Sequence, residues 1–283
     1  MKILITFAIS LLLIAHFHES VAQSKTSTFN KSWLKAIASI EIENHGAFFP
    51  IGTGFISATP GGHIALVTAK HVVFDENGKI IPNIIYRLNE HHTTSRPYPA
   101  NYPPKYVDNL GWFFSEKYDL SCRFLVYSDS ADFVEIDSTD YLGVDSLDAG
   151  ANVLVIGFPL GLRSEKYANP LVRHGIVSRA DSSEILVDAF VFPGNSGGPV
   201  LYLPTIKIGG GLLSPFINSE RIIGLVSGYV PYEDVAISNQ TRRPRVVFEE
   251  NSGLCVVVPI IALTEVFQSA KFQAVDHQLY KYR

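Results

Sequence analysis

Short runs of β-branched and aromatic residues, separated by turn-forming residues, constrain the fold of this chain more than any other feature. Stretches rich in Gly, Pro and Asn lie between these runs, as in TPGG at 59–62 and DENGK at 75–79. Alternating strand and turn signals are typical of β-sandwiches and β-barrels, so the sequence predicts an all-β protein. Seven runs have the length of a strand: 36–44, 51–58, 63–69, 151–159, 184–192, 221–230 and 253–259.

Helical patterns and long polar stretches are few. One helical turn is expected in the segment after VTAKHV at 67–72, and a short C-terminal helix is expected within 260–272. Residues 23–32 are rich in Ser, Thr and Lys and are expected to be flexible. The stretches interpreted as loop insertions are 75–117, 202–220 and 230–252, and residues 271–283 are interpreted as a C-terminal tail.

The first 22 residues have the layout of a secretory signal. Lys2 precedes an apolar run of about a dozen residues, and small residues end the segment at Ala22, where we expect cleavage. An uncleaved membrane anchor is the alternative, but the run is short for spanning a bilayer. We therefore expect an exported protein, periplasmic or secreted, with no stable membrane anchor after cleavage.

Charge and cysteine content exclude several classes of protein. The formal net charge is −4, whereas a nucleic-acid partner requires a concentrated basic face. Only two cysteines are present, so the fold is not a disulfide scaffold. Cys122 and Cys255 could pair, but two buried thiols are the favoured interpretation. The histidines, cysteines and acids show no metal-ligand spacing, so we expect no metal and no cofactor.

The stretch FVFPGNSGGPV at 190–200 surrounds Ser196 with three glycines and two prolines. A tight turn between two strands explains this composition. A loop whose backbone N–H groups point at one spot beside a hydroxyl explains it as well. Because a serine hydroxyl is a poor nucleophile by itself, the second explanation requires a histidine and an acid elsewhere in the chain.

Two residues at strand ends are candidates for these partners. His71 follows the apolar run 63–69, where an imidazole would be held firmly and face a cleft, or would simply cap the strand. Asp119 begins an apolar strand after a charged turn, and Asp108 lies in a more turn-like context. A buried aspartate orients the histidine in catalytic triads, although either aspartate could cap a turn.

Three motifs together resemble those of the trypsin-like, chymotrypsin-fold serine proteases, in the order found in that family. Lys70 stands where the family more often has a small residue. The resemblance runs from about residue 36 to 268 and is closest to the HtrA/Deg protease domain, without the PDZ domains that usually follow it. The motifs are TAKHV at 68–72, YDLS at 118–121 and GNSGGPV at 194–200. The longer stretch VDAFVFPGNSGGPV at 187–200 resembles the nucleophile segment of the HtrA/Deg branch. Other strands of that branch are resembled by VIGFPLG at 155–161, HGIVSRA at 174–180, IIGLVSG at 222–228 and GLCVVVPI at 253–260.

The resemblance implies two packed six-stranded antiparallel β-barrels over residues 33–270, with the lobe boundary at about 130–148. It implies a catalytic triad of His71, Asp119 and Ser196, acting on polypeptides through an acyl-enzyme. Backbone N–H groups of Gly194 and Ser196 would form the oxyanion hole, with Asn195 between them. Asn195 carries no charge for a newly formed N-terminus, so we expect no activating cleavage.

The resemblance also implies a substrate pocket. Phe190 is not acidic, so a small or apolar substrate side chain is expected rather than Lys or Arg. His174 would line a pocket for acidic residues or simply lie on the surface, and the surface is favoured. The oligomeric state stays open. The residues implied for the substrate pocket are Phe190, Phe192, Pro193, Ser227, Gly228 and Tyr229. The backbone of Ser227 is expected to pair with an extended peptide.

Two other classes of protein remain to be weighed. GNSGG also fits the G-x-S-x-G nucleophile elbow of α/β-hydrolases, in which a histidine and an acid must follow the serine. Only His277, beside Asp276, follows Ser196, and helices are scarce. A silent secreted binding protein on a protease fold is the second alternative, favoured by Lys70 and the long loops. Three matching motifs favour a serine endopeptidase.

Overall fold

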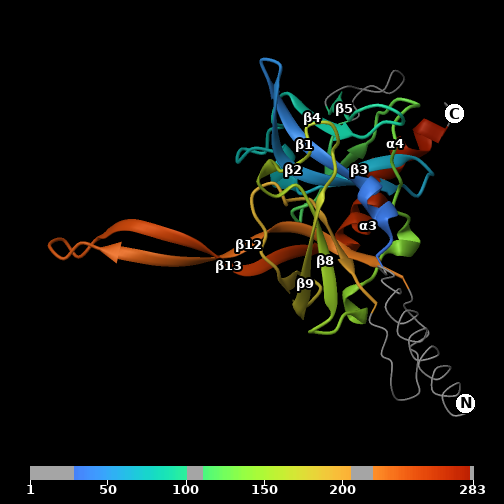
Figure 1. Ribbon diagram of the computed structural model, residues 1–283. Helices are drawn as coiled ribbons and strands as arrows, with labels where there is room; N and C mark the ends of the chain where they lie inside the picture. Colours follow the sequence, from blue (N-terminus) through green and yellow to red (C-terminus); the bar gives the residue numbers. More distant parts are fainter. Residues whose placement is uncertain (1–28, 101–110, 205–218, 281–283) are drawn as a thin grey trace, which may run out of the picture. The chain divides into compact units, whose positions relative to one another are not determined.

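The computed structural model describes residues 29–100, 111–204 and 219–280, which form two antiparallel β lobes and a helical C-terminus (Figure 1). Residues 32–283 form one compact unit, and the other unit, residues 1–31, lies almost wholly outside the described residues. The predicted signal segment and the candidate Asp108 also lie outside the described residues. No helix in the described part is long and apolar enough to cross a membrane.

The first lobe is a seven-stranded sheet with the strand order β5-β4-β1-β2-β3-β7-β6. Its core consists of large side chains with no exposed surface, among them Ile40, Phe55 and Leu66. Such runs of β-branched and aromatic residues suit strands covered on both faces. The strands are β1 (Ile37–Asn44), β2 (Ala47–Ala58), β3 (Ile64–Thr68), β4 (Ile84–Leu88), β5 (Arg96–Pro99), β6 (Phe113–Phe114) and β7 (Ser121–Phe124).

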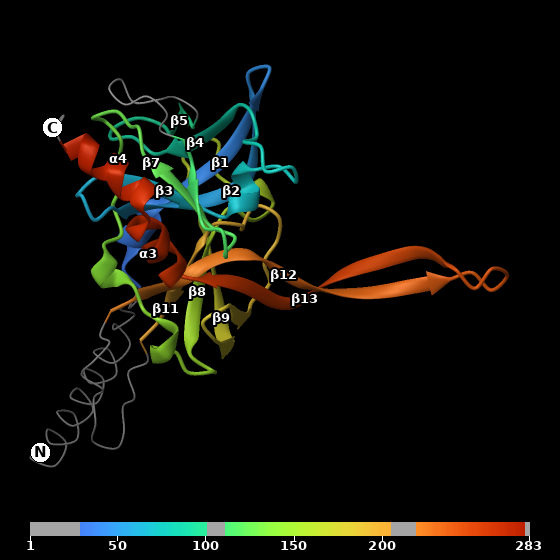
Figure 2. The ribbon, with the colours of Figure 1, turned by 180° about the vertical axis from the view of Figure 1, so that it is seen from behind.

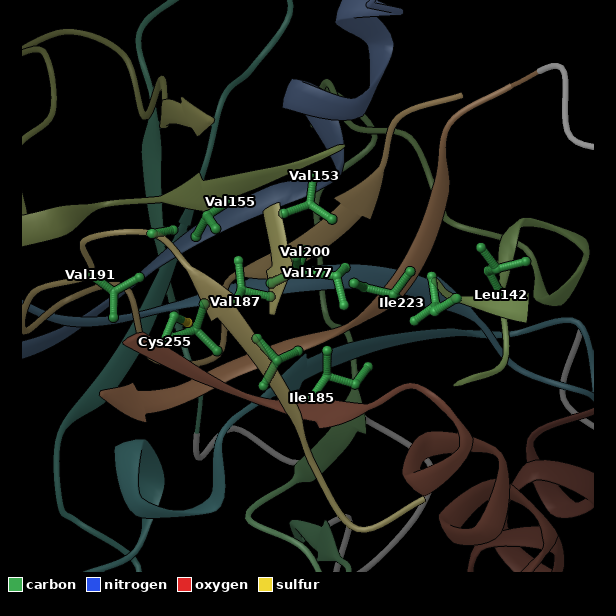
Figure 3. Close-up of a cluster of buried hydrophobic side chains, with 14 residues drawn as sticks. Leu142, Val153, Val155, Val177, Ile185, Val187, Val191, Val200, Ile223 and Cys255 are labelled. Carbon is green, nitrogen blue, oxygen red and sulfur yellow. The ribbon is translucent and has the colours of Figure 1, made fainter. Parts of the chain in front are cut away.

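The second lobe is a closed six-stranded barrel with the strand order β10-β13-β12-β11-β8-β9. Small β-branched side chains fill it, and Figure 3 shows Val155, Val187 and Val200 pointing into one cluster with Cys255. A narrow barrel is filled by side chains, so valines suit its interior. The strands are β8 (Asn152–Gly157), β9 (Leu171–Ala180), β10 (Ile185–Asp188), β11 (Pro199–Tyr202), β12 (Arg221–Ile237) and β13 (Pro244–Pro259).

Short helices connect the strands and end the chain. The 3-10 helices are η1 (Lys31–Ala36), η2 (Ser138–Asp140), η3 (Val144–Ser146) and η4 (Pro159–Gly161), and the α-helices are α2 (Lys70–Val73), α3 (Ile261–Gln268) and α4 (Ala270–Tyr280).

The C-terminus is a packed helix rather than the predicted tail. Helix α4 lies beside the first lobe (Figure 2). The ring of Phe272 stacks on Phe124 with 4.9 Å between centroids. The buried Asp276 carboxylate accepts hydrogen bonds from the Thr59 hydroxyl at 2.7 Å and the Gly61 N–H at 2.7 Å. The folded unit therefore extends past residue 270.

The predicted two-lobe, all-β fold is confirmed, with differences in three places. The first lobe has seven strands rather than six. The stretch 75–117, interpreted as a loop insertion, contains β4, β5 and β6. The stretch 230–252 is not a loop either, because β12 and β13 continue through it as a long two-stranded ribbon. Most of 202–220 lies outside the described residues.

The two cysteines are free thiols buried in different lobes, Cys122 on β7 and Cys255 on β13. The favoured interpretation of two buried thiols is thus confirmed. Burial raises the pKa of the Cys122 thiol far above its usual value and raises the pKa of Cys255 to about 12. The thiolate is the reactive form, so both residues should be inert in the folded protein.

We expect neither cysteine to react with iodoacetamide in the native protein, even at a pH of about 8.5, where an ordinary thiol is half ionised. A raised pKa lowers the thiolate fraction at any given pH, and burial blocks the reagent as well. In denaturant both residues should react. Mass spectrometry of the intact protein counts the added groups, and rapid native alkylation or a mass short of two hydrogens would contradict the expectation.

Candidate active site

His71 is presented by helix α2, a single turn that directly follows the buried strand β3. Val72 and Val73 are buried and fix this turn against the lobe, while half of the His71 side chain is exposed. The Lys70 ammonium group lies 4.2 Å from the centroid of the Phe114 ring, a cation–π contact that gives it a partner away from the imidazole. The backbone of His71 is therefore fixed by the buried turn at the end of β3, the strand end that the sequence predicted.

Asp119 lies between β6 and β7 and contacts His71 through both carboxylate oxygens. Its Oδ2 is 2.7 Å from His71 Nδ1, and its Oδ1 accepts the backbone N–H of His71 at 3.0 Å. Two contacts from one carboxylate fix both the position and the rotation of the imidazole. The N–H at Nδ1 then points to Asp119, which leaves Nε2 as the acceptor.

Ser227, at the end of the buried part of β12, is a further residue of this site. Its hydroxyl donates to Asp119 Oδ2 at 2.6 Å, and its carbonyl oxygen lies 3.5 Å from Ser196 Oγ. The sequence predicted only a backbone role for this residue. The available signal was that Ser227 is a polar residue directly after the apolar run 222–226. That signal does not indicate which residue its hydroxyl contacts.

The electrostatics of the site keep Asp119 ionised. Burial of the carboxyl by itself raises its pKa, but the hydrogen bonds from His71, the charge of a protonated His71 and the hydrogen bond from Ser227 outweigh burial. The pKa of Asp119 consequently lies below its usual value. The carboxylate thus stays charged in mildly acidic solution, where it can stabilise a positive charge on the imidazole.

Ser196 lies in a tight turn between β10 and β11 that is attached to the first lobe. Its carbonyl oxygen accepts the backbone N–H of Thr53 at 2.9 Å, and the Thr53 hydroxyl donates to the Gly194 carbonyl at 2.6 Å. The backbone N–H groups of Gly194 and Ser196 donate to no other group among the described residues. Two neighbouring free donors beside a serine hydroxyl suit a developing oxyanion.

The glycines of the turn are required by close packing and by backbone conformation. Gly194 has φ +98° and Gly197 has φ +84°, in the left-handed region. A Cβ atom at Gly194 would lie 2.3 Å from the Phe158 carbonyl oxygen, and one at Gly198 would lie 2.3 Å from that of Ile156. The absence of a side chain at Gly198 therefore allows the turn to pack closely against β8 of the barrel.

Asn195 shapes the turn from inside the protein. Its side chain is buried, and its Oδ1 accepts the Phe192 N–H at 3.0 Å while its own N–H donates to the Phe192 carbonyl at 2.9 Å. Its carbonyl oxygen accepts the Gly198 N–H at 2.8 Å. These bonds hold the turn with an uncharged side chain.

The residues predicted for the substrate pocket lie around this turn, on the segment before it and on β12. Phe190 is half-exposed, and its ring faces Gly253. Gly228 has open space where a side chain would be. The remaining members have other contacts: Arg173 over the Phe192 ring at 5.5 Å, Leu160 N–H to the Pro193 carbonyl at 2.7 Å, and the Tyr229 hydroxyl to Glu249 at 2.6 Å.

Two other predicted or rival residues lie elsewhere. His174 is exposed on β9, with its Nε2 3.1 Å from Asn152 Oδ1. Asp276 contacts His63 Nδ1 at 2.8 Å and not Ser196, which removes the acid that the α/β-hydrolase alternative needed. Within the described ranges, no three His, Cys, Asp or Glu side chains gather in a way that would hold a metal ion.

The structure thus brings His71 and Asp119 into direct contact and connects Asp119 to Ser196 through Ser227. Among the described residues no hydrogen bond joins Ser196 to His71. The histidine–aspartate pair lies on one β lobe and the glycine-flanked serine on the other. This arrangement is typical of a class of serine peptidases.

Comparison with known proteins identifies the family. Residues 52–203 match the trypsin-like peptidase domain, which is more than half of the chain, so the chain belongs to that family. A comparison with curated proteins finds no match.

Two solved structures are similar to this chain. One is an alanine variant of the HtrA-type protease AlgW with a tripeptide, at 16% identity and a TM-score of 0.48, covering 84% of this chain. The other is AlgW with a tripeptide, at 18% identity and a TM-score of 0.48, covering 82% of this chain. The present chain spans 60% and 59% of the length of those two chains.

Proposed function

We propose that this protein is an exported serine endopeptidase that hydrolyses polypeptides through a Ser196–His71–Asp119 triad. The observation that carries the proposal is the 2.7 Å contact between His71 Nδ1 and Asp119 Oδ2. That contact sets the imidazole so that Nε2 is free to accept a proton. The turn around Ser196 adds two unused N–H donors to the same site.

In the proposed reaction, His71 Nε2 removes the hydroxyl proton of Ser196 as the oxygen attacks a peptide carbonyl. The carboxylate of Asp119 stabilises the imidazolium that results. The N–H groups of Gly194 and Ser196 bind the oxyanion, and water then hydrolyses the acyl-enzyme with His71 again as the base. Contacts between nucleophile and base commonly shorten when substrate binds, so the proposal does not require a preformed Ser196–His71 bond.

For specificity, we propose that an extended peptide pairs with β12 at Ser227 to Tyr229. The neighbouring Phe190 supplies an apolar wall, and the open space at Gly228 leaves room for a side chain. This arrangement favours a small or apolar residue before the cleaved bond. Mass spectrometry of peptide libraries after digestion tests this preference, and consistent cleavage after Lys or Arg would contradict it.

A serine-reactive fluorophosphonate probe tests the proposal directly. We expect the probe to label the native protein and not the Ser196→Ala variant, because only an activated hydroxyl attacks phosphorus. Labelling should also disappear after denaturation. Labelled protein recovered from the exported fraction should begin at Gln23, which tests the predicted signal cleavage.

The alternative, a silent binding protein on the same fold, gives the opposite result. In that case the native protein remains unlabelled although its circular dichroism and melting are normal. The Ser57→Ala variant is a useful control, because Ser57 is a buried serine of the first lobe whose hydroxyl is 2.7 Å from that of Tyr141. Labelling that survives Ser196→Ala but not Ser57→Ala would also contradict the proposed triad.

A further inference from the structure

The ribbon formed by residues 231–237 of β12 and 244–251 of β13 has no covering element in the described part of the chain. Strand β12 pairs with β11 only up to Leu225, and β13 pairs with β10 only from Leu254 onward. Beyond these points the two strands pair only with each other and project from the second lobe (Figures 1 and 2). An isolated two-stranded ribbon is marginally stable in water, so this one would gain from a partner.

One face of the ribbon carries a defined sequence of side chains. Residues directly opposite each other in an antiparallel pair share a face, and so do alternate residues along each strand. The register pairs Glu233 with Glu249 and Val235 with Val247. Beyond this pair the register shifts, so that Ile237 lies opposite Pro244. Arg245, which alternates with Val247 along β13, lies on the face of Val247. We name this set the ribbon face: Glu233, Val235, Ile237, Arg245, Val247 and Glu249.

The apolar residues of the ribbon face are exposed, as are Tyr232, Val246 and Phe248 on the opposite face. Val247 is 53% exposed and Ile237 is 59% exposed, and Val235 lies directly across from Val247. Exposed β-branched residues on an unpaired ribbon favour association with another surface. The apolar centre therefore indicates an interface.

The charges on the ribbon face are separated along its length. Glu233 and Glu249 lie opposite each other near the lobe, an arrangement that repels. Arg245 lies toward the tip, near Arg242 and Arg243 in the turn. None of these five side chains forms an ion pair with another described residue. The acidic end of the face therefore has no basic partner, and the basic end has no acidic partner, among the described residues.

We propose that the ribbon face binds a second copy of this chain, with two ribbons antiparallel about a twofold axis at the Val235–Val247 pair. The glutamates lie two residues from this pair on one side, and Arg245 lies two residues from it on the other, roughly 7 Å each way at the rise of a strand. The twofold axis therefore places the arginine of each copy on the glutamates of the other.

The order acid, apolar, base favours a second copy over an unrelated partner. A twofold interface requires one patch to be complementary to itself, and the ribbon face meets this requirement. A partner with a single sign of charge would leave Arg245 or the two glutamates unmatched. The proposal concerns association and does not depend on the catalytic activity of the site.

Sedimentation equilibrium of the purified protein at low salt tests the proposal. We expect a monomer–dimer equilibrium. Arg245→Glu should raise the dissociation constant at least about 10-fold, and so should the double variant Glu233→Lys/Glu249→Lys, because each variant places like charges together. An equimolar mixture of the two variants should restore a dimer, since every contact then joins opposite charges.

The opposite face of the ribbon supplies the matched control. Asp234 pairs with Phe248 on that face, so Asp234→Lys should change the dissociation constant by less than about threefold. A monomer at about 100 μM protein would overturn the proposal, since even weak specific pairs associate there. The proposal would also be overturned if neither charge-reversal variant weakened the dimer, or if the two variants did not associate on mixing.

Discussion

Replacing Asp119 by asparagine is expected to lower kcat/KM on a peptide substrate by about 10⁴-fold while the protein still folds. The carboxylate accepts from both the backbone N–H and the Nδ1 of His71. An asparagine can keep the first bond but can present an N–H group to Nδ1, which favours the tautomer whose Nε2 is protonated. That tautomer cannot accept the proton of Ser196, and no charge remains to stabilise an imidazolium.

The Ser227→Ala variant is the matched control for this effect. It removes the 2.6 Å hydrogen bond to Asp119 Oδ2 but leaves the charge and both contacts with His71. Loss of one hydrogen bond to a charged group costs about 1.5 kcal/mol or more, so a decrease of roughly 10-fold is expected. Circular dichroism and thermal melting establish that both variants fold. Near-normal turnover in Asp119→Asn would remove Asp119 from the triad and favour Asp108.

The strands were accessible from sequence because their signals are local, whereas the pairing of His71 with Asp119 was implied by the resemblance to the trypsin-like proteases. Runs such as 63–69 combine β propensity with burial of most of their side chains, and a histidine or aspartate at the end of such a run is held by its backbone. Asp119 and His71 are 48 residues apart, yet each lies at the edge of the strand that positions it. The neighbouring strands β3 and β7 then bring the two ends together.

The contacts that the sequence did not predict join distant residues without a local signal. Ser227 and Asp119 are 108 residues apart, and Asp276 and His63 are 213 apart. Nothing around Asp276 distinguishes a buried acceptor from an exposed helix residue. The ribbon was missed for another reason, because 231–237 and 244–251 mix charged and apolar residues without strict alternation, a pattern that resembles a loop.

Replacing Gly197 by alanine is expected to lower the free energy of unfolding by about 3–5 kcal/mol. Two causes add at this position. The left-handed φ of +84° disfavours any residue with a Cβ atom. That atom would also lie 2.1 Å from the Thr68 hydroxyl oxygen and 2.2 Å from the Thr53 carbonyl oxygen. Both neighbours are buried, and the Thr68 hydroxyl donates to that carbonyl at 2.7 Å, so neither can move easily.

The Gly46→Ala variant separates the two causes. Gly46 has φ +82°, nearly the same as Gly197, but nothing lies within 4 Å of its added Cβ. Only backbone strain remains there, about 1 kcal/mol, which corresponds to roughly 2–4 °C in Tm for a chain of this size. The larger destabilisation of Gly197→Ala should lower Tm by about 10 °C. Equal Tm decreases in the two variants would contradict the packing that we assign to the serine turn.

Gly197→Ala should also reduce the activity of the protein that remains folded. The new methyl group would displace the carbonyl oxygen of Thr53. The N–H of the same residue donates to the Ser196 carbonyl oxygen. A shift of Thr53 therefore moves both Ser196 and Gly194, which the Thr53 hydroxyl holds. Labelling by the fluorophosphonate probe, measured per folded molecule well below the Tm, should slow in Gly197→Ala and stay normal in Gly46→Ala.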